Sequence, residues 1–134
     1  MATYTADAVA LLAYLVDALP QRADRVFAEA EAGEAVVQTP TTAVAETLYS
    51  VSRDKDVRGI TLQGTPEQAR QALLDTGPVT VSADDDELVE FATVVDEFSI
   101  HDAMVVASHR AAETEGIVTS DGVIGDAGYE TVWK

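Results

Sequence analysis

The segment EGIVTSDGVIGDAGYETVW, residues 115–133, holds the pattern that decides the fold. Ile117, Val118 and Thr119 form a short apolar and β-branched run that predicts a buried strand. This strand leads directly into Asp121. A carboxylate at the end of a buried strand lies at an edge of the sheet, where acidic residues from distant parts of the sequence can join it.

Strand-like segments alternate with helical periodicity along the whole chain. The predicted strands are 2–6, 35–39, 78–82, 117–120 and 129–133. The predicted helices are 7–20, 21–33, 40–56, 65–77, 83–98 and 99–116, and residues 58–64 are predicted as a connection. Such alternation is typical of βαβ units, so we predict one α/β domain over residues 1–134. It is a three-layer α/β/α sandwich with a central, mostly parallel sheet of about five strands.

The composition bounds the class of protein. An apolar fraction of 47% indicates a folded chain, and the absence of cysteine excludes disulfides and thiolate metal sites. No run of about 18 apolar residues is present, so we expect no membrane span. The N-terminal segment lacks the basic region of a secretory signal, so we expect a cytoplasmic protein.

The charge is strongly negative. The 24 acidic and 8 basic residues give a net charge of −16, and only Lys55 and Lys134 are lysines. One explanation is a surface for a basic partner. The other is a halophilic origin, because molar salt shortens the Debye length to about 3 Å and screens self-repulsion. The acids are scattered along the chain, apart from the run at 84–87, and this scatter favours the halophilic explanation.

Four acidic residues are predicted to meet at one edge of the sheet. Asp7 follows the first strand, and Asp121 follows the strand at 117–120. Asp102 lies in the first turn of the helix before that strand, and Glu46 lies inside the helix after the second strand. Functional residues of open parallel sheets gather outside the carboxyl ends of the strands, which supports this convergence.

Each of these acids also has a purely structural interpretation. Asp7 is a candidate N-cap, Asp102 follows Ser99 at capping-box spacing, Asp121 precedes Gly122 as in a common turn, and Glu46 can be an exposed helix residue.

Three further features of the sequence have structural interpretations. Asp126 is interpreted as a turn residue, with contact to a second metal ion or its water as the alternative. The acidic run at 84–87 is interpreted as a solvated helix start. His101 is interpreted as a surface residue, or as a contact to a phosphate of substrate or product.

A cluster of four carboxylates has a specific chemical consequence. Like charges that lie close together raise each other's pKa, and a divalent cation relieves their repulsion. Oxygen ligands favour Mg²⁺ or Mn²⁺ over zinc. Such an ion provides an activated water for attack on a phosphodiester and screens the incoming phosphate from the acidic protein.

At these residues the sequence resembles the PIN domain of VapC-type toxins, over nearly the whole chain. The first motif is YTADAVALLAYL with Asp7, and the second is VAETLY with Glu46. The third is DAMVVASHRAA with Asp102, and the fourth is VTSDGVI with Thr119 and Asp121. The closing GYETVW is similar to the last edge strand of the family.

The resemblance implies a Mg²⁺- or Mn²⁺-dependent endoribonuclease whose metal is held by Asp7, Glu46, Asp102 and Asp121. Thr119 and Ser120 are expected to orient a ligand or a water. The candidate contacts to RNA phosphates are Arg53, Arg58 and Arg110.

The resemblance also implies partners. A small antitoxin is expected to insert a basic side chain among the acids. A homodimer is expected, with the apolar helices AVALLAYLVDAL and AVAETLYSV as candidates for its interface. The sequence departs from the family at Val9, where many members have asparagine, and at 122–124, where a phenylalanine is common.

Two other functions remain open from the sequence. The first is a PIN-like protein of RNA processing, or a non-catalytic RNA-binding protein. The second is a Rossmann-like structural or regulatory domain whose acids are only helix caps and solvated surface.

Overall fold

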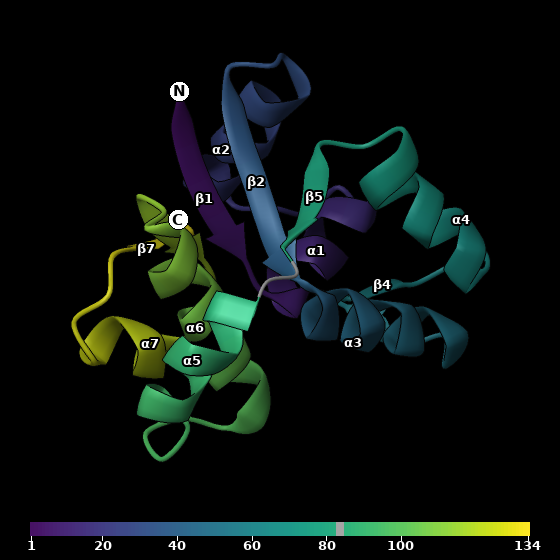
Figure 1. Ribbon diagram of the computed structural model, residues 1–134. Helices are drawn as coiled ribbons and strands as arrows, with labels where there is room; N and C mark the ends of the chain where they lie inside the picture. Colours follow the sequence, from purple (N-terminus) through teal and green to yellow (C-terminus); the bar gives the residue numbers. More distant parts are fainter. Residues whose placement is uncertain (83–84) are drawn as a thin grey trace.

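The computed structural model describes residues 1–82 and 85–134. Its helices and strands alternate along the chain as predicted (Figure 1). The strands are β1 (Ala2–Ala6), β2 (Ala35–Pro40), β3 (Asp56–Val57), β4 (Ile60–Thr61), β5 (Val79–Ser82), β6 (Gly116–Val118) and β7 (Thr131–Val132). The helices are α1 (Ala8–Leu15), α2 (Gln21–Glu31), α3 (Thr41–Ser52), α4 (Pro66–Arg70), which continues as the π-helical turn η1 (Gln71–Asp75), α5 (Asp85–Val94), α6 (Ile100–Ala112) and α7 (Gly122–Asp126).

The five-stranded sheet confirms the predicted fold class. Its order is β5-β2-β1-β6-β7, and each neighbouring pair of strands is parallel. Because the connections lead from β1 outward in both directions, the strand order reverses at β1, where β2 lies on one side and β6 on the other. The carboxyl ends of β1, β2 and β6 therefore surround a topological switch point.

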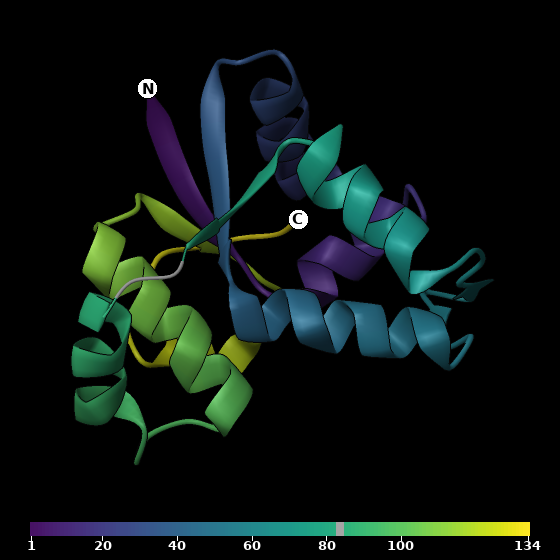
Figure 2. The ribbon, with the colours of Figure 1, turned by 45° about the vertical axis from the view of Figure 1, so that its right-hand side comes forward.

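Apolar side chains cover both faces of this sheet. On one face, Leu11 of α1 and Phe27 of α2 pack with Val118 of β6. On the other face, Val106 of α6 packs with Ile117 of β6. Neighbouring residues of β6 thus enter opposite cores, as the two-residue period of a strand requires. Figure 2 shows α5 and α6 on one side of the sheet, with α1, α2, α3 and α4 on the other.

The predicted dimer interface is largely used inside the protomer. In α1, Ala10 and Leu11 are fully buried, and in α3, Val44 and Val51 are buried as well. Their apolar periodicity therefore reports packing onto the sheet and onto α4, and these faces are not available to a second copy.

Two predictions at the level of secondary structure were incomplete. Residues 122–126 form the short helix α7, where the sequence had indicated only a turn. The connection at 58–64 takes part in a two-stranded hairpin, because β3 and β4 pair in antiparallel fashion. The hairpin crosses the end of α3 and buries Leu62 against Val51 and Ala69.

The predicted solvated start of the helix at 83–98 was wrong for one residue. Glu87 is 5% exposed and its Oε1 accepts a hydrogen bond of 2.8 Å from the Ser82 hydroxyl. A buried carboxylate needs such a donor. Residues 83 and 84 of this prediction lie outside the described residues.

No helix in the described parts of the chain combines the length and the apolar character that crossing a membrane requires.

Candidate active site

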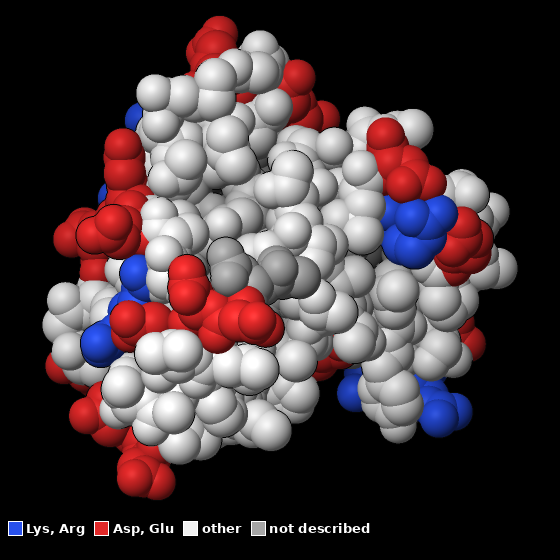
Figure 3. Space-filling model, in the orientation of Figure 1, with Lys and Arg blue, Asp and Glu red and all other residues white. Residues whose placement is uncertain are grey.

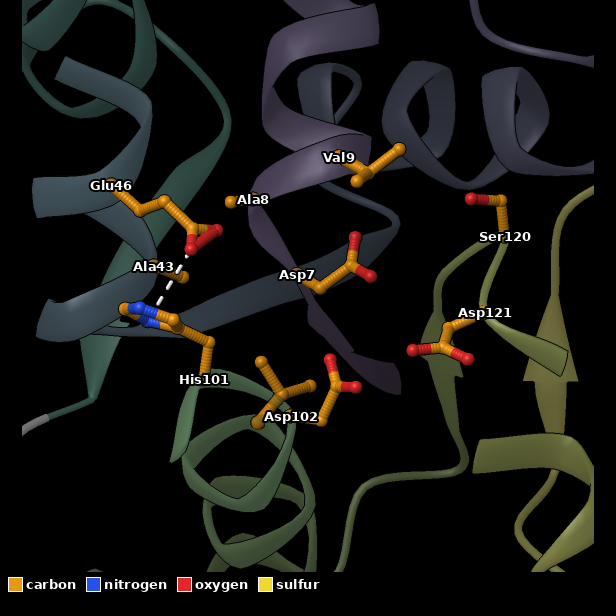
Figure 4. A pocket seen from close by; sticks show the side chains of 10 residues that line it. Asp7, Ala8, Val9, Ala43, Glu46, His101, Asp102, Ser120 and Asp121 are labelled. Atoms are coloured by element: carbon orange, nitrogen blue, oxygen red, sulfur yellow. Dashed lines mark ion pairs between the residues drawn. The ribbon is translucent and has the colours of Figure 1, made fainter. Parts of the chain in front are cut away.

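A pocket of about 230 Å³ opens at the switch point, beyond the carboxyl ends of β1 and β6. All four predicted acids line it (Figure 4). The lining residues are Asp7, Ala8, Val9, Ala43, Glu46, His101, Asp102, Val105, Ser120 and Asp121. Residues separated by up to 114 positions in the sequence are therefore brought to one cavity by the parallel sheet.

Asp7 is the most buried of the four acids in this pocket. It is the N-cap of α1, and its Oδ1 accepts a hydrogen bond of 2.9 Å from the backbone N–H of Ala10. Its Oδ2 accepts the Thr119 hydroxyl at 2.5 Å. Burial nevertheless raises the pKa of Asp7 to about 6, and the charges of Asp102 and Asp121 add to this increase. The N-cap and the pocket residue are thus the same side chain.

Asp121 is held by a second helix cap. It caps α7, where its Oδ1 accepts the backbone N–H of Val123 at 2.8 Å. Its own backbone N–H donates to the Thr119 hydroxyl oxygen at 3.0 Å. Thr119 therefore connects Asp7 and Asp121, and its predicted role in orienting a ligand or a water stays a prediction. Ser120 lies at the pocket wall itself.

Asp102 enters the pocket from the first turn of α6. The helix begins at Ser99, whose hydroxyl accepts the backbone N–H of Asp102, as the capping pattern predicted. Partial burial and the neighbouring carboxylate of Asp121 together raise the pKa of Asp102 to about 6. Figure 4 shows the carboxylates of Asp7, Asp102 and Asp121 turned toward a common space.

Glu46 lies on the opposite wall, on α3, and pairs with His101. The distance from His101 Nδ1 to Glu46 Oε2 is 3.3 Å (Figure 4). Among the described residues that line the pocket, His101 is the only one able to carry positive charge. His101 thus lines the pocket with a side chain that is 56% exposed, and its predicted contact to a phosphate stays a prediction.

The donor set of the pocket is chemically suited to Mg²⁺ or Mn²⁺, because its acidic ligands offer only oxygen. Within residues 1–82 and 85–134, however, no three His, Cys, Asp or Glu side chains lie close enough together to hold a metal ion. Repulsion among the carboxylates and the pairing of Glu46 with His101 are consistent with this open arrangement.

The remaining predicted residues lie outside the pocket lining. Asp126 is exposed at the end of α7. Arg53 and Arg58 are exposed beyond the end of α3. Arg110 is paired with Glu90 at 2.6 Å and donates to the Tyr129 hydroxyl, so it is committed to contacts within the chain.

The sequence did not predict the apolar part of the pocket wall. Ala8, Ala43 and Val105 contribute to it. Val9 also lines the pocket, with 45% of its surface exposed. The departure from the family at Val9 was the one sequence signal for this wall, since it substitutes an apolar group for a polar one beside the acids.

Comparisons with known proteins find structural likeness only. No family model matches the sequence, and no curated protein matches it.

The solved structures that match nearly the whole chain include the following two. VapC20 of Mycobacterium tuberculosis, described as a toxin that cleaves the sarcin–ricin loop, matches with 22% identity and a TM-score of 0.67 over 98% of this chain and 99% of that one. A chain of VapBC2 from Rickettsia felis, in a complex with a DNA fragment from its promoter, matches with 12% identity and a TM-score of 0.69 over 97% and 98%. The chain therefore has the α/β fold of these VapC structures, which is the PIN-domain fold that the sequence resemblance implied.

Proposed function

We propose that this protein is a Mg²⁺- or Mn²⁺-dependent ribonuclease and the toxin of a toxin–antitoxin pair. The observation that carries the proposal is the convergence of Asp7, Glu46, Asp102 and Asp121, from four separate elements, on one pocket. Helix caps alone would explain Asp7 and Asp121, but not the presence of Glu46 and Asp102 in the same cavity. The fold shared with VapC20, described as an RNA-loop-cleaving toxin, supports the same reaction class.

The pKa shifts support a cation at this position. The pKa values of Asp7 and Asp102 are both raised to about 6. Bringing the two carboxylates together is therefore unfavourable while both are ionised. A divalent cation would relieve this cost. When bound, it would supply an activated water and positive charge beside a phosphodiester.

The side chains have separate tasks under this proposal. Thr119 and the two helix caps fix Asp7 and Asp121 before any ligand arrives. Asp102 and Glu46 complete the ligand set from α6 and α3. Ser120 and His101, which line the same pocket, would contact the phosphate oxygens of the substrate.

The toxin part of the proposal rests on the same structural likeness. VapBC2 was solved together with promoter DNA, which is the arrangement expected when an antitoxin pairs with the toxin and represses its own gene. We propose a small antitoxin with a basic side chain that enters the acidic pocket. A homodimer remains a proposal from the family resemblance. The alternative function is a PIN-like protein of RNA processing that binds RNA without cutting it.

The test is Mn²⁺ binding by calorimetry, followed by cleavage of a fluorescein-labelled RNA in Mg²⁺ or Mn²⁺. Wild type should bind Mn²⁺ and cleave, whereas Asp102→Asn should lose both, with a rate decrease of at least about a hundredfold. Asp24→Asn, an exposed acid on α2, is the matched control and should behave as wild type. Binding of RNA without cleavage by wild type would favour the non-catalytic alternative, and equal weak heats from all three proteins would remove the metal site.

A further inference from the structure

A row of side chains on α3 leads from the pocket to the C-terminal end of the helix. Glu46 lines the pocket, Tyr49 follows three residues later on the same side, and Arg53, the C-cap residue of α3, follows after four more. Their spacings of three and four residues place these side chains in one row. From Glu46 to Arg53 the row advances about 10 Å along the helix axis. The row is thus a continuous path from the acidic pocket to the end of α3.

Tyr49 is an exposed aromatic residue on this path. Tyr49 is 54% exposed, so a ligand can reach its ring. The Arg53 guanidinium lies 4.8 Å and the Lys55 ammonium 5.5 Å from the ring centroid. Aromatic rings flanked by cations are the elements from which sequence-tolerant sites for single-stranded nucleic acid are built, since bases stack on the ring and phosphates meet the cations.

Arg58 adds a third cation at a position where arginine is locally unfavourable. It occupies the turn between β3 and β4, with φ of 51°, and is followed by Gly59 with φ of 84°. Hairpin turns with two positive φ values strongly prefer asparagine, aspartate or glycine at the first position. A strained residue at an exposed turn points to a function for its side chain.

Two of the three cations at this end of α3 contact the Tyr49 ring. Within the described residues, none of Arg53, Lys55 and Arg58 forms an ion pair, in contrast to Arg70 and Arg110. Asp54 and Asp56 lie in the same stretch, so its net charge is three minus two, or +1, on a chain of −16. Asp56 accepts the Thr61 hydroxyl at 2.7 Å inside the hairpin. In Figure 3, blue side chains appear at the lower right, where Figure 1 places the end of α3 and the hairpin.

We propose that Tyr49, Arg53, Lys55 and Arg58, here called the basic end of α3, form a binding subsite for single-stranded RNA. A base stacks on Tyr49, and the three cations contact the phosphates of the strand that continues from the pocket. This inference rests on the proposed function, since it extends the path of the same substrate. It also answers a physical difficulty: a protein with a net charge of −16 repels RNA unless a local basic surface attaches it.

The test is fluorescence anisotropy with a labelled, mixed-sequence single-stranded RNA of about 12 nucleotides. Binding is measured in EDTA, so that cleavage does not interfere. Tyr49→Ala should weaken binding about tenfold, because one stacked base is lost, whereas Tyr49→Phe should retain it. Arg53→Gln, Lys55→Gln and Arg58→Gln should each weaken binding and reduce the slope of log affinity against log salt by about 0.7.

Arg22→Gln is the matched control for charge. Arg22 is an exposed arginine on α2, beside a different pocket that includes Tyr4 and Val132, and its variant should bind RNA as wild type does. Equal losses for Arg22→Gln and Arg53→Gln would mean diffuse attraction to any cation and would overturn the subsite. Wild-type affinity for Tyr49→Ala, or no RNA binding by wild type, would overturn it as well.

Cleavage measured separately distinguishes the two proposals. If wild type cleaves RNA and Tyr49→Ala binds and cleaves unchanged, the nuclease stands and the subsite fails. If the variants lose RNA binding but wild type never cleaves, the subsite stands and the nuclease fails.

Discussion

The hydroxyl of Thr119 donates a hydrogen bond to Asp7 across 112 positions of sequence, at 2.5 Å. The same oxygen accepts the backbone N–H of Asp121 at 3.0 Å. One threonine at the end of β6 therefore fixes the relative positions of two carboxylates that belong to different helix caps. The pocket is organised by this residue before any ligand is present.

We expect Thr119→Val to reduce RNA cleavage by about ten- to a hundredfold, the range for partners that orient metal ligands. Valine has nearly the same shape, so the change removes the hydrogen bonds and leaves the packing of β6 intact. Cleavage and Mn²⁺ affinity are measured together. Thr119→Ser keeps the hydroxyl and should restore most of both; an active Thr119→Val would show that the caps alone position the acids.

Asp7→Asn should stabilise the metal-free protein at neutral pH. The pKa of Asp7 is raised from 3.8 to about 6 by burial, so its favourable contribution is complete below about pH 3.8 and is lost as the pH rises through 6. Neutral asparagine avoids this loss and retains an oxygen for the cap. We expect the free energy of unfolding of Asp7→Asn to exceed that of wild type by about 2 kcal/mol above pH 6.

The measurement is urea unfolding in EDTA on both sides of this pH window. The gain of Asp7→Asn should shrink as the pH falls toward 4. An equal difference between variant and wild type at every pH would mean that ionisation of Asp7 is not its cause.

Gln38 joins the sheet to α6 through partly buried hydrogen bonds. Its side-chain amide donates to the hydroxyl of Thr5 at 3.0 Å and to that of Ser108 at 3.1 Å. Gln38→Met should lower the free energy of unfolding by about 2 kcal/mol, because both hydroxyls lose a donor in a largely buried place. Urea denaturation measures this loss. Gln71→Met, at an exposed glutamine, is the matched control and should change stability by less than about 0.5 kcal/mol.

Gly77 is required by close packing of the backbone. A Cβ at this position would lie 1.9 Å from the carbonyl oxygen of Ala72 and 2.5 Å from that of Leu73. Gly77→Ala should therefore destabilise the protein by about 3 kcal/mol, since the backbone after η1 must move. Gly122→Ala is the matched comparison, because a Cβ there meets nothing within 4 Å. The melting temperature should fall strongly for Gly77→Ala and stay unchanged for Gly122→Ala.

Much of the fold could be predicted because its signals are local. Thr65 caps α4, with Pro66 at the first helical position, and Ser99 caps α6 at the spacing that the sequence indicated. Asp7 and Asp121 cap helices as well. Helix α7 was missed because five residues are too few to show a periodic pattern, and an Asp-Gly pair is ordinarily read as a turn.

Other features depend on contacts between distant segments. Glu87 looked like a solvated acid in an acidic run, yet it is buried because Ser82 of β5 turns a hydroxyl toward it. The pairing of Glu46 with His101 joins α3 to α6, and no spacing in the sequence indicates it. The sequence also did not indicate that Tyr49 is exposed, since the residues around it form a mostly apolar stretch.

The sequence by itself determined which segments become helices and strands, and it placed Asp7, Asp102 and Asp121 at element boundaries. Helix caps and hydrophobic periodicity depend on residues a few positions apart, so a short segment of sequence is enough to predict them. Only the tertiary structure decided that these acids meet Glu46 in one pocket, and that the row from Glu46 to Arg53 leads out of it. Those relations follow from the strand order β5-β2-β1-β6-β7 and from the packing of α3 and α6 on that sheet, which depend on the whole chain.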